Sequence, residues 1–202
     1  MAFGLAVGTY GASFGAAAVA AGLTVTQACV TSLLVFTGAS QFALIGVLGA
    51  GGAAAAGIAS AVLLGSRNAL YAVVLKDLVP VRGWRRVIAA QVTIDESTGV
   101  ATTAPREHAG VGFWVTGLAV YGAWNLFTLI GALGAGAVDT RAIGLDGAVA
   151  AAFLALLWPR LRQDPWVALG GTGLALVALP LTPAGVPVLV AALAVLPRLV
   201  RR

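Results

Sequence analysis

The chain of 202 residues is 60% hydrophobic and only 9% charged, and its mean hydropathy is +0.99. Soluble globular domains carry about 25% charged residues, so this composition excludes a soluble domain and predicts an integral membrane protein. The formal charge of +5 comes almost entirely from arginine. In so apolar a chain, arginines in loops are expected to set the orientation in the membrane and not to bind nucleic acid.

Apolar stretches follow one another along the whole chain and leave no room for a domain outside the membrane. Because roughly 20 apolar residues cross the bilayer core, a chain of this length allows six or seven short spans. We therefore expect one transmembrane domain over residues 1–202, with an all-α integral membrane fold: a polytopic bundle of about seven transmembrane helices. The expected spans are 4–23, 28–50, 53–75, 110–134, 146–159, 165–181 and 185–197.

The weaker stretch 87–104 differs from the others because Asp95 and Glu96 occupy its centre. Each carboxylate would cost about 2.5–3.5 kcal/mol at the centre of a lipid-exposed helix. We therefore expect this segment to be re-entrant, broken or sheltered by protein, or to lie near the interface.

The distribution of basic residues favours the same interpretation. They cluster at 76–86, at 160–162 and at the C-terminal end. If 87–104 does not span, all three clusters fall on the cytoplasmic side, and the connection 135–146 falls outside. This arrangement predicts seven spans with the N-terminus outside and the C-terminus inside.

Glycines are frequent in the first and fourth stretches, with small-xxx-small spacing at Gly4/Gly8 and Gly11/Gly15. Such spacing lets helix backbones approach closely in lipid, although a general preference for small residues explains single sites equally well. Alternatively, the two glycine-rich stretches could be broken helices, which transporters use to expose backbone groups.

Arg67, followed by Asn68, stands about 12 Å inside the predicted end of its span, given a rise of 1.5 Å per residue. A guanidinium at that depth needs an anionic partner, and the nearest intramembrane acids in sequence are Asp95 and Glu96. An intramembrane ion pair is a candidate functional site, but a purely structural clamp is an equal alternative.

Three amides or polar clusters could contact a ligand or another helix. Gln41 lies mid-span within one turn of Thr37 and Ser40, which favours a ligand-facing patch slightly over a hydrogen bond between helices. Asn125, beside Trp124 and one turn before Thr128, favours an interhelical bond slightly over ligand contact. Asn68 joins the candidate site through its neighbour Arg67.

Motifs for catalysis are absent or misplaced in the sequence. A Walker A loop needs Gly-Lys-Ser/Thr, but Lys76, the chain's single lysine, precedes Asp77. Gly11–Gly15 matches G-x-S-x-G, but a nucleophile elbow also needs a histidine base, and His108 lies in a polar connector expected to be solvated. A single histidine also excludes an HExxH zinc site. We predict no enzyme activity, no catalytic residue, no metal and no cofactor.

Several short runs resemble the AzlC family, the large subunit of bacterial branched-chain amino acid exporters. They occur in the family's order and extend over nearly the whole chain. The chain departs from the family at Gly65 and Asn68, where many members have asparagine and histidine. The runs are Gly11–Gly15, Thr37–Phe42, Ser66–Tyr71, Thr93–Ser97, Trp124–Gly131 and Gly144–Gly147; the family pattern carries over to Gly38, Gln41, Arg67, Asp95 and Glu96.

The resemblance implies a multi-pass permease in the bacterial cytoplasmic (inner) membrane that exports branched-chain amino acids together with a small AzlD-type membrane subunit. Export against a gradient needs an energy source, and without an ATP site the simplest hypothesis is proton antiport through Asp95 or Glu96. The competing hypotheses are a membrane scaffold or assembly subunit without transport, which would tolerate apolar replacements at Gln41, Arg67 and Asp95, and an intramembrane enzyme.

Overall fold

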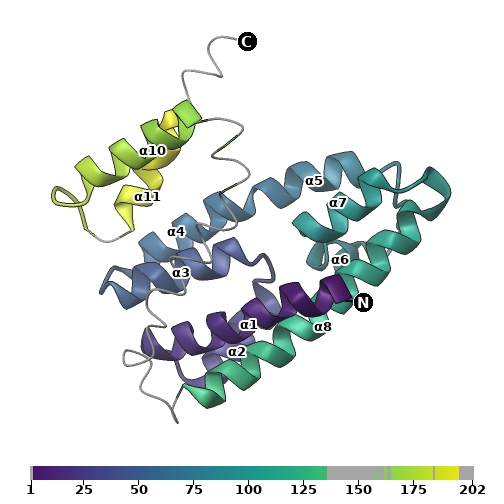
Figure 1. Cartoon of the computed structure of the whole chain (residues 1–202), viewed down its shortest axis with the longest axis horizontal. Helices are drawn as coiled ribbons and strands as arrows, with labels where there is room; N and C mark the ends of the chain where they lie inside the picture. Colours follow the sequence, from purple (N-terminus) through teal and green to yellow (C-terminus); the bar gives the residue numbers. More distant parts are fainter. Residues whose placement is uncertain (1, 136–157, 159–161, 163–164, 184, 196–202) are drawn as a thin grey trace.

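A computed structural model describes residues 2–135, 158, 162, 165–183 and 185–195, and every regular element in this part of the chain is helical (Figure 1). Two of the helices pack most extensively against each other, and the expected span 28–50 and the segment 87–104 are both interrupted. In chain order the helices are α1 (Ala2–Ala20), α2 (Val25–Leu34), α3 (Ala39–Gly49), α4 (Ala54–Gly65), α5 (Arg67–Leu75), α6 (Arg85–Gln91), α7 (Asp95–Thr103), α8 (Arg106–Gly134), α10 (Pro165–Ala178), α11 (Val186–Ala191) and the 3₁₀ turn η1 (Ala192–Val195).

Helices α1 and α8 lie side by side because glycines bring their backbones together (Figure 1). A Cβ built at Gly11 would overlap the Trp124 carbonyl oxygen, and one at Gly131 would overlap the Ala12 carbonyl oxygen. This is the close approach that small-residue spacing allows in lipid. The idea that the glycine-rich first and fourth stretches are broken helices is wrong, because α1 and α8 are both continuous.

The breaks lie elsewhere, in the expected span 28–50 and in segment 87–104, which was not expected to cross the membrane as a lipid-exposed helix. Stretch 28–50 is divided into α2 and α3 at Gly38, whose φ of 62° is rarely adopted by a residue with a side chain. Segment 87–104 is divided into α6 and α7, with Asp95 as the first residue of α7. Of the alternatives expected for this segment the structure shows the broken one, and neither half is long enough to cross a bilayer.

Two helical runs are long and apolar enough to cross a membrane: Ala54–Leu75, which joins α4 to α5 through Ser66, and α8. Shorter apolar helices are α2, α3 and α10. The two long runs and α10 agree with the expected spans 53–75, 110–134 and 165–181, whereas the expected span 146–159 lies outside the described residues except for residue 158. The total of seven spans and the orientation in the membrane stay predictions.

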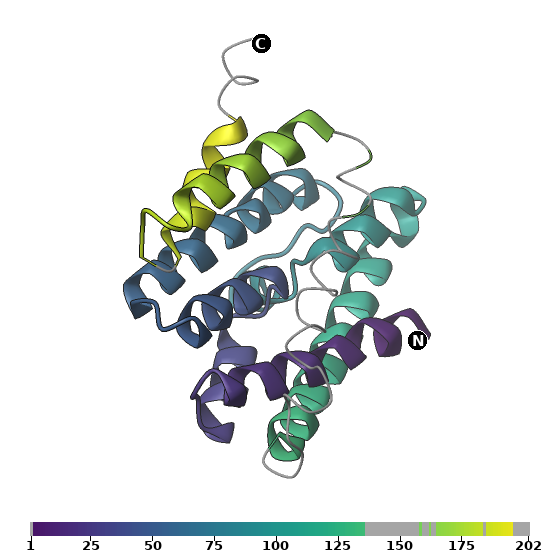
Figure 2. The ribbon, with the colours of Figure 1, turned by 60° about the vertical axis from the view of Figure 1, so that its left-hand side comes forward.

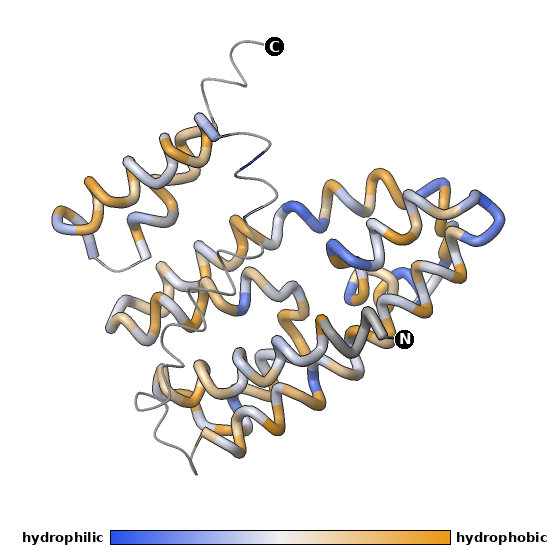
Figure 3. Tube along the Cα trace, in the orientation of Figure 1, coloured by the Kyte–Doolittle hydropathy of each residue, from blue (hydrophilic) through white to orange (hydrophobic). Residues whose placement is uncertain are grey.

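The helices are stacked in layers. Turning the molecule shows α10 and α11 against α4, then α3, then the crossing pair α1 and α8 (Figure 2). Most of the chain is apolar along its length, and hydrophilic residues gather where α5 ends and α8 begins (Figure 3). Many large apolar side chains on α4, α5, α8 and α10 face outward, as expected for helices in contact with lipid.

Candidate functional site

A cavity of about 990 Å³ lies where the two broken stretches meet. Its walls are mainly apolar, and its charged groups come from α5 and α7. Both helix breaks contribute, through Phe36–Gly38 and through Ile94. The C-terminal helices, to which the sequence analysis gave no role in the site, close one side. The lining residues are Val7, Tyr10, Phe36–Ala39, Phe42, Ala43, Gly46, Val47, Ala50, Leu64, Arg67, Tyr71, Ile94–Glu96, Val120, Trp124, Ala175, Leu179, Gly185 and Pro187.

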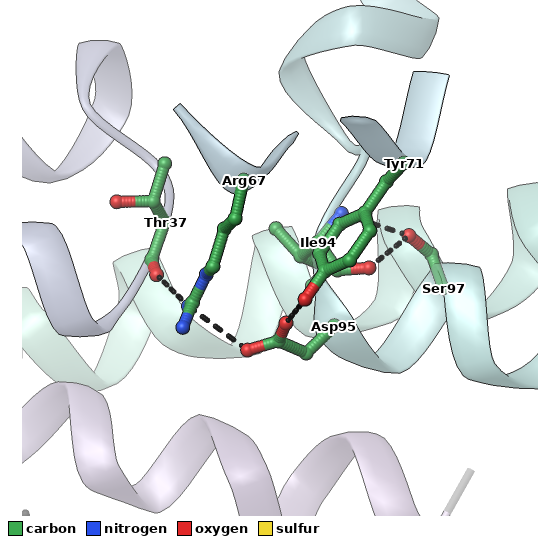
Figure 4. A network of polar contacts seen from close by, with 6 residues as sticks. All are labelled: Thr37, Arg67, Tyr71, Ile94, Asp95 and Ser97. Carbon is green, nitrogen blue, oxygen red and sulfur yellow. Dashed lines mark hydrogen bonds and ion pairs between the residues drawn. The ribbon is translucent and has the colours of Figure 1, made fainter. Parts of the chain in front are cut away.

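Arg67 joins the two breaks through one guanidinium (Figure 4). Its Nη2 lies 2.9 Å from Oδ2 of Asp95 and donates a hydrogen bond of 3.4 Å to the carbonyl oxygen of Thr37. Thr37 belongs to the α2–α3 break, and Asp95 begins α7. The expected anionic partner of Arg67 is therefore Asp95. Glu96 also lines the cavity but makes no ion pair with Arg67.

Tyr71 completes this network, and the sequence analysis did not single it out. Its hydroxyl donates a hydrogen bond to Oδ1 of Asp95, so that each carboxylate oxygen has a partner (Figure 4). Tyr71 follows Arg67 by four residues, and residues at this spacing share one face of a helix. This spacing is the signal that could have identified Tyr71.

The start of α7 is built to hold two carboxylates at the cavity. Asp95 and Glu96 occupy its first turn, where the partial positive charge of a helix N-terminus stabilises negative groups. The Ser97 hydroxyl accepts a hydrogen bond of 3.1 Å from the Ile94 backbone N–H and donates one of 2.6 Å to the Val92 carbonyl oxygen. Ser97 therefore satisfies backbone groups that the break would otherwise leave unpaired.

Gln41 lies in the first turn of α3 and not in the middle of a span, because the break at Gly38 starts a new helix there. Its side chain is fully buried, and neither amide atom has a hydrogen-bond partner in the described part of the chain. Ser40 is also buried, with its hydroxyl unpartnered there. A buried amide without partners costs about 1–3 kcal/mol, so this arrangement destabilises the fold.

Trp124 packs directly against the α3 break, since a Cβ built at Gly38 would lie 3.7 Å from its ring. Its ring makes edge-to-face contacts with Phe36 and Phe42, and its Nε1 has no hydrogen-bond partner among the described residues. Of the neighbouring polar groups, Thr128 shares a hydrogen bond of 3.2 Å with Ser32 of α2. Thr128 thus links α8 to α2, one turn after Asn125.

Three of the predicted site residues lie outside the cavity lining: Gln41, Asn68 and Asn125. Asn125 Nδ2 donates to the Tyr121 carbonyl oxygen one turn earlier at 2.9 Å; this bond lies within α8, so the interhelical bond expected from Asn125 is wrong in the described part of the chain. Asn68 is half-buried, with its Oδ1 unpartnered among the described residues. The structure therefore brings Arg67, Asp95 and Glu96 together at the cavity, and the three amides are not part of its lining.

The two motifs that were set aside have ordinary structural positions. The G-x-S-x-G match at Gly11–Gly15 lies inside α1 against α8 and not on a strand-to-helix turn. His108 belongs to the first turn of α8 and not to a loop, because α8 begins at Arg106. Its side chain is 71% exposed, in agreement with the expected solvated position.

Apolar helices that enclose a cavity with charged groups at helix breaks define a membrane protein with an internal site. A family model described as AzlC protein matches residues 2–138, and the chain belongs to the AzlC family. This family is a transporter family associated with branched-chain amino acid transport. No curated protein and no solved structure matches the chain. The C-terminal helices that close the cavity lie beyond the matched residues.

Proposed function

We propose that the chain is the large permease subunit of a secondary transporter that exports branched-chain or related apolar amino acids across the bacterial cytoplasmic membrane, together with a small AzlD-type subunit. The observation that carries the proposal is the ion pair of Arg67 and Asp95 in the wall of an apolar cavity. Ligand sites combine apolar walls with a few polar groups that fix orientation, and the cavity volume of about 990 Å³ is at the upper end of such sites.

The paired charges suit a zwitterion. An amino acid carries one carboxylate and one ammonium on the same carbon. It can therefore give Arg67 and Asp95 a new partner each, without adding net charge to the cavity. Its carboxylate would bind the Arg67 guanidinium, and its ammonium would bind Asp95 or the Thr37 carbonyl oxygen that now accepts from Arg67. The apolar side chain would pack against Phe36, Phe42 and neighbouring aliphatic residues.

Proton antiport supplies the energy in this proposal. Asp95 and Glu96 are the acids in the lining, and intramembrane carboxylates are typical proton carriers in transporters. If either acid carries the proton, the double variant Asp95→Asn/Glu96→Gln loses the dependence of efflux on the pH gradient. Efflux by the double variant that still follows the gradient would remove this part of the proposal.

The principal test is efflux of preloaded radiolabelled leucine, valine and methionine from cells that express the chain with and without the small AzlD-type subunit. We expect efflux only when both chains are present. Absence of efflux for all three, with both proteins shown to be inserted and intact, would contradict the assignment of the substrate. Efflux by the large chain alone would contradict the two-subunit part.

Variants of the ion pair then separate transport from scaffolding. Arg67→Gln and Asp95→Asn should each lower efflux at least ten-fold, because each leaves one substrate charge without a partner. The matched controls are Arg106→Gln and Glu107→Gln, which remove the same charges from exposed positions at the start of α8. Full efflux by Arg67→Gln, at equal amounts of inserted protein, would favour the scaffold hypothesis.

A further inference from the structure

A second cavity, of about 890 Å³, lies at the end of the molecule where α5 ends and α8 begins, and it shares no residue with the first. One wall is the connection between α5 and α6, and the other is a face of α8. This is also the end where hydrophilic residues gather (Figure 3). The lining residues are Leu78–Arg82, Trp84, Arg85, Ile88, Gly110, Trp114 and Leu118.

The α8 wall is an apolar stripe that runs along a candidate membrane span. Gly110, Trp114 and Leu118 are spaced four residues apart and so share one face of the helix. At 1.5 Å per residue they lie about 6, 12 and 18 Å from the start of α8 at Arg106. The groove therefore extends from the end of the span towards the centre of the hydrocarbon layer.

The wall opposite α8 is cationic. Arg82 and Arg85 belong to its lining, and no lining residue is acidic. Within the described part of the chain neither arginine forms an ion pair. The Arg85 guanidinium lies 6.0 Å from the centre of the Trp84 ring, and Trp84 is 69% exposed. Two cations and an exposed indole at the end of a span are typical of the membrane interface.

We propose that this groove binds an anionic glycerophospholipid, with its phosphate at Arg82 and Arg85 and one acyl chain along the α8 stripe. Charge and depth together favour this ligand. Basic pockets next to membrane spans attract anionic headgroups, and the apolar stripe reaches a depth that acyl chains occupy. The inference is independent of the transported substrate, because the two cavities have no residue in common.

Gly110 allows the acyl-chain part to be tested separately from the charges. A Cβ built there would meet nothing closer than the Leu78 carbonyl oxygen at 4.0 Å. Gly110→Leu should therefore fold and fill the groove while both arginines remain. Gly122→Leu is the matched control, since it lies on the same helix, outside the groove, and a Cβ there would meet nothing within 4 Å.

The experiment is native mass spectrometry of the detergent-solubilised full chain with an equimolar mixture of phosphatidylglycerol and phosphatidylcholine of identical acyl chains. We expect the wild type to retain phosphatidylglycerol preferentially. Each of Arg82→Gln and Arg85→Gln should lower this preference about five-fold, as expected for one cation at a membrane surface. Lys76→Gln removes one charge outside the lining and should leave the preference unchanged.

Gly110→Leu should lower the amount of bound phosphatidylglycerol, whereas Gly122→Leu should not. Added inorganic phosphate should not displace the lipid at millimolar concentration, because it lacks the acyl chain. The proposal is overturned if the arginine variants keep the wild-type preference, if Gly110→Leu binds as much lipid as Gly122→Leu, or if free phosphate displaces the lipid. Retention of the small membrane subunit in place of lipid, when both chains are purified together, would also overturn it.

Discussion

At the scale of single residues, Gln41 has the least favourable environment of the predicted site residues. Its amide is fully buried without a partner in the described part of the chain, one turn from the Gly38 break. Replacing a buried amide by a nonpolar side chain usually costs stability because hydrogen bonds are lost, but the Gln41 amide makes no hydrogen bond in the described part of the chain. Natural proteins keep such costly groups where function needs them.

Gln41→Leu should therefore stabilise the protein and weaken transport. Leucine has a similar size and removes the unpaired amide, so we expect the free energy of unfolding to rise by about 1–3 kcal/mol. Thermal unfolding in detergent measures the first effect, and amino acid efflux measures the second. A variant that is more stable and exports at the wild-type rate would exclude a functional role for this amide.

The ion pair predicts a different pattern of stability. Arg67→Gln and Asp95→Asn each leave a charge without its partner, and we expect each to cost about 1–3 kcal/mol, between the values for exposed and buried pairs. The double variant should recover most of this loss, because no unpaired charge remains. Additive losses in thermal unfolding of the three variants would show that the two charges do not interact.

At the scale of elements, glycine has two separate roles in this chain. On α1 and α8 it permits contact between two unbroken helices, whereas at Gly38 it supplies a backbone conformation that ends one helix and starts another. The sequence pattern alone could not separate these roles, since both appear as glycine in an apolar stretch. The positive φ at Gly38 and the close approach at Gly131 depend on neighbours distant in sequence.

Gly131→Ala and Gly122→Ala on α8 test the contact role. A Cβ at Gly131 would overlap the Ala12 backbone, so we expect the variant to lose about 1–3 kcal/mol of stability. A Cβ at Gly122 would meet nothing within 4 Å, and alanine there should stabilise the helix by up to about 1 kcal/mol. Equal melting temperatures for the two variants would contradict the packing of α1 on α8.

The composition and charge pattern were sufficient to predict apolar helices, a segment around Asp95 that does not cross as an ordinary lipid-exposed helix, and an acidic partner for Arg67. These features follow from the cost of charge in a membrane, which acts locally on the chain. Tyr71 was accessible through its spacing from Arg67 but was overlooked. The contributions of Leu179, Gly185 and Pro187 to the cavity could not be predicted, because only the tertiary packing brings α10 and α11 to the site.

At the scale of the whole molecule, the orientation in the membrane determines which leaflet the basic end of α5 and α6 meets. The positive-inside pattern predicts that residues 76–86 face the cytoplasm and 135–146 face outside. In a Cys29→Ala background, a membrane-impermeant maleimide should label Trp84→Cys only in inside-out vesicles. Asp139→Cys should react only in intact cells or right-side-out vesicles. The reverse labelling would invert the predicted topology.

The bridge made by Arg67 has a thermodynamic consequence for the two halves of the site. One guanidinium holds the Thr37 carbonyl oxygen on one side and the Asp95 carboxylate on the other, so the two chain segments share a single cation. A ligand that binds the Arg67 guanidinium in place of these two partners releases both segments at the same time. By linkage, if release of one segment changes the ligand affinity by some factor, ligand binding changes the equilibrium for that release by the same factor. The two contacts of Arg67 therefore couple segments that lie far apart in the sequence.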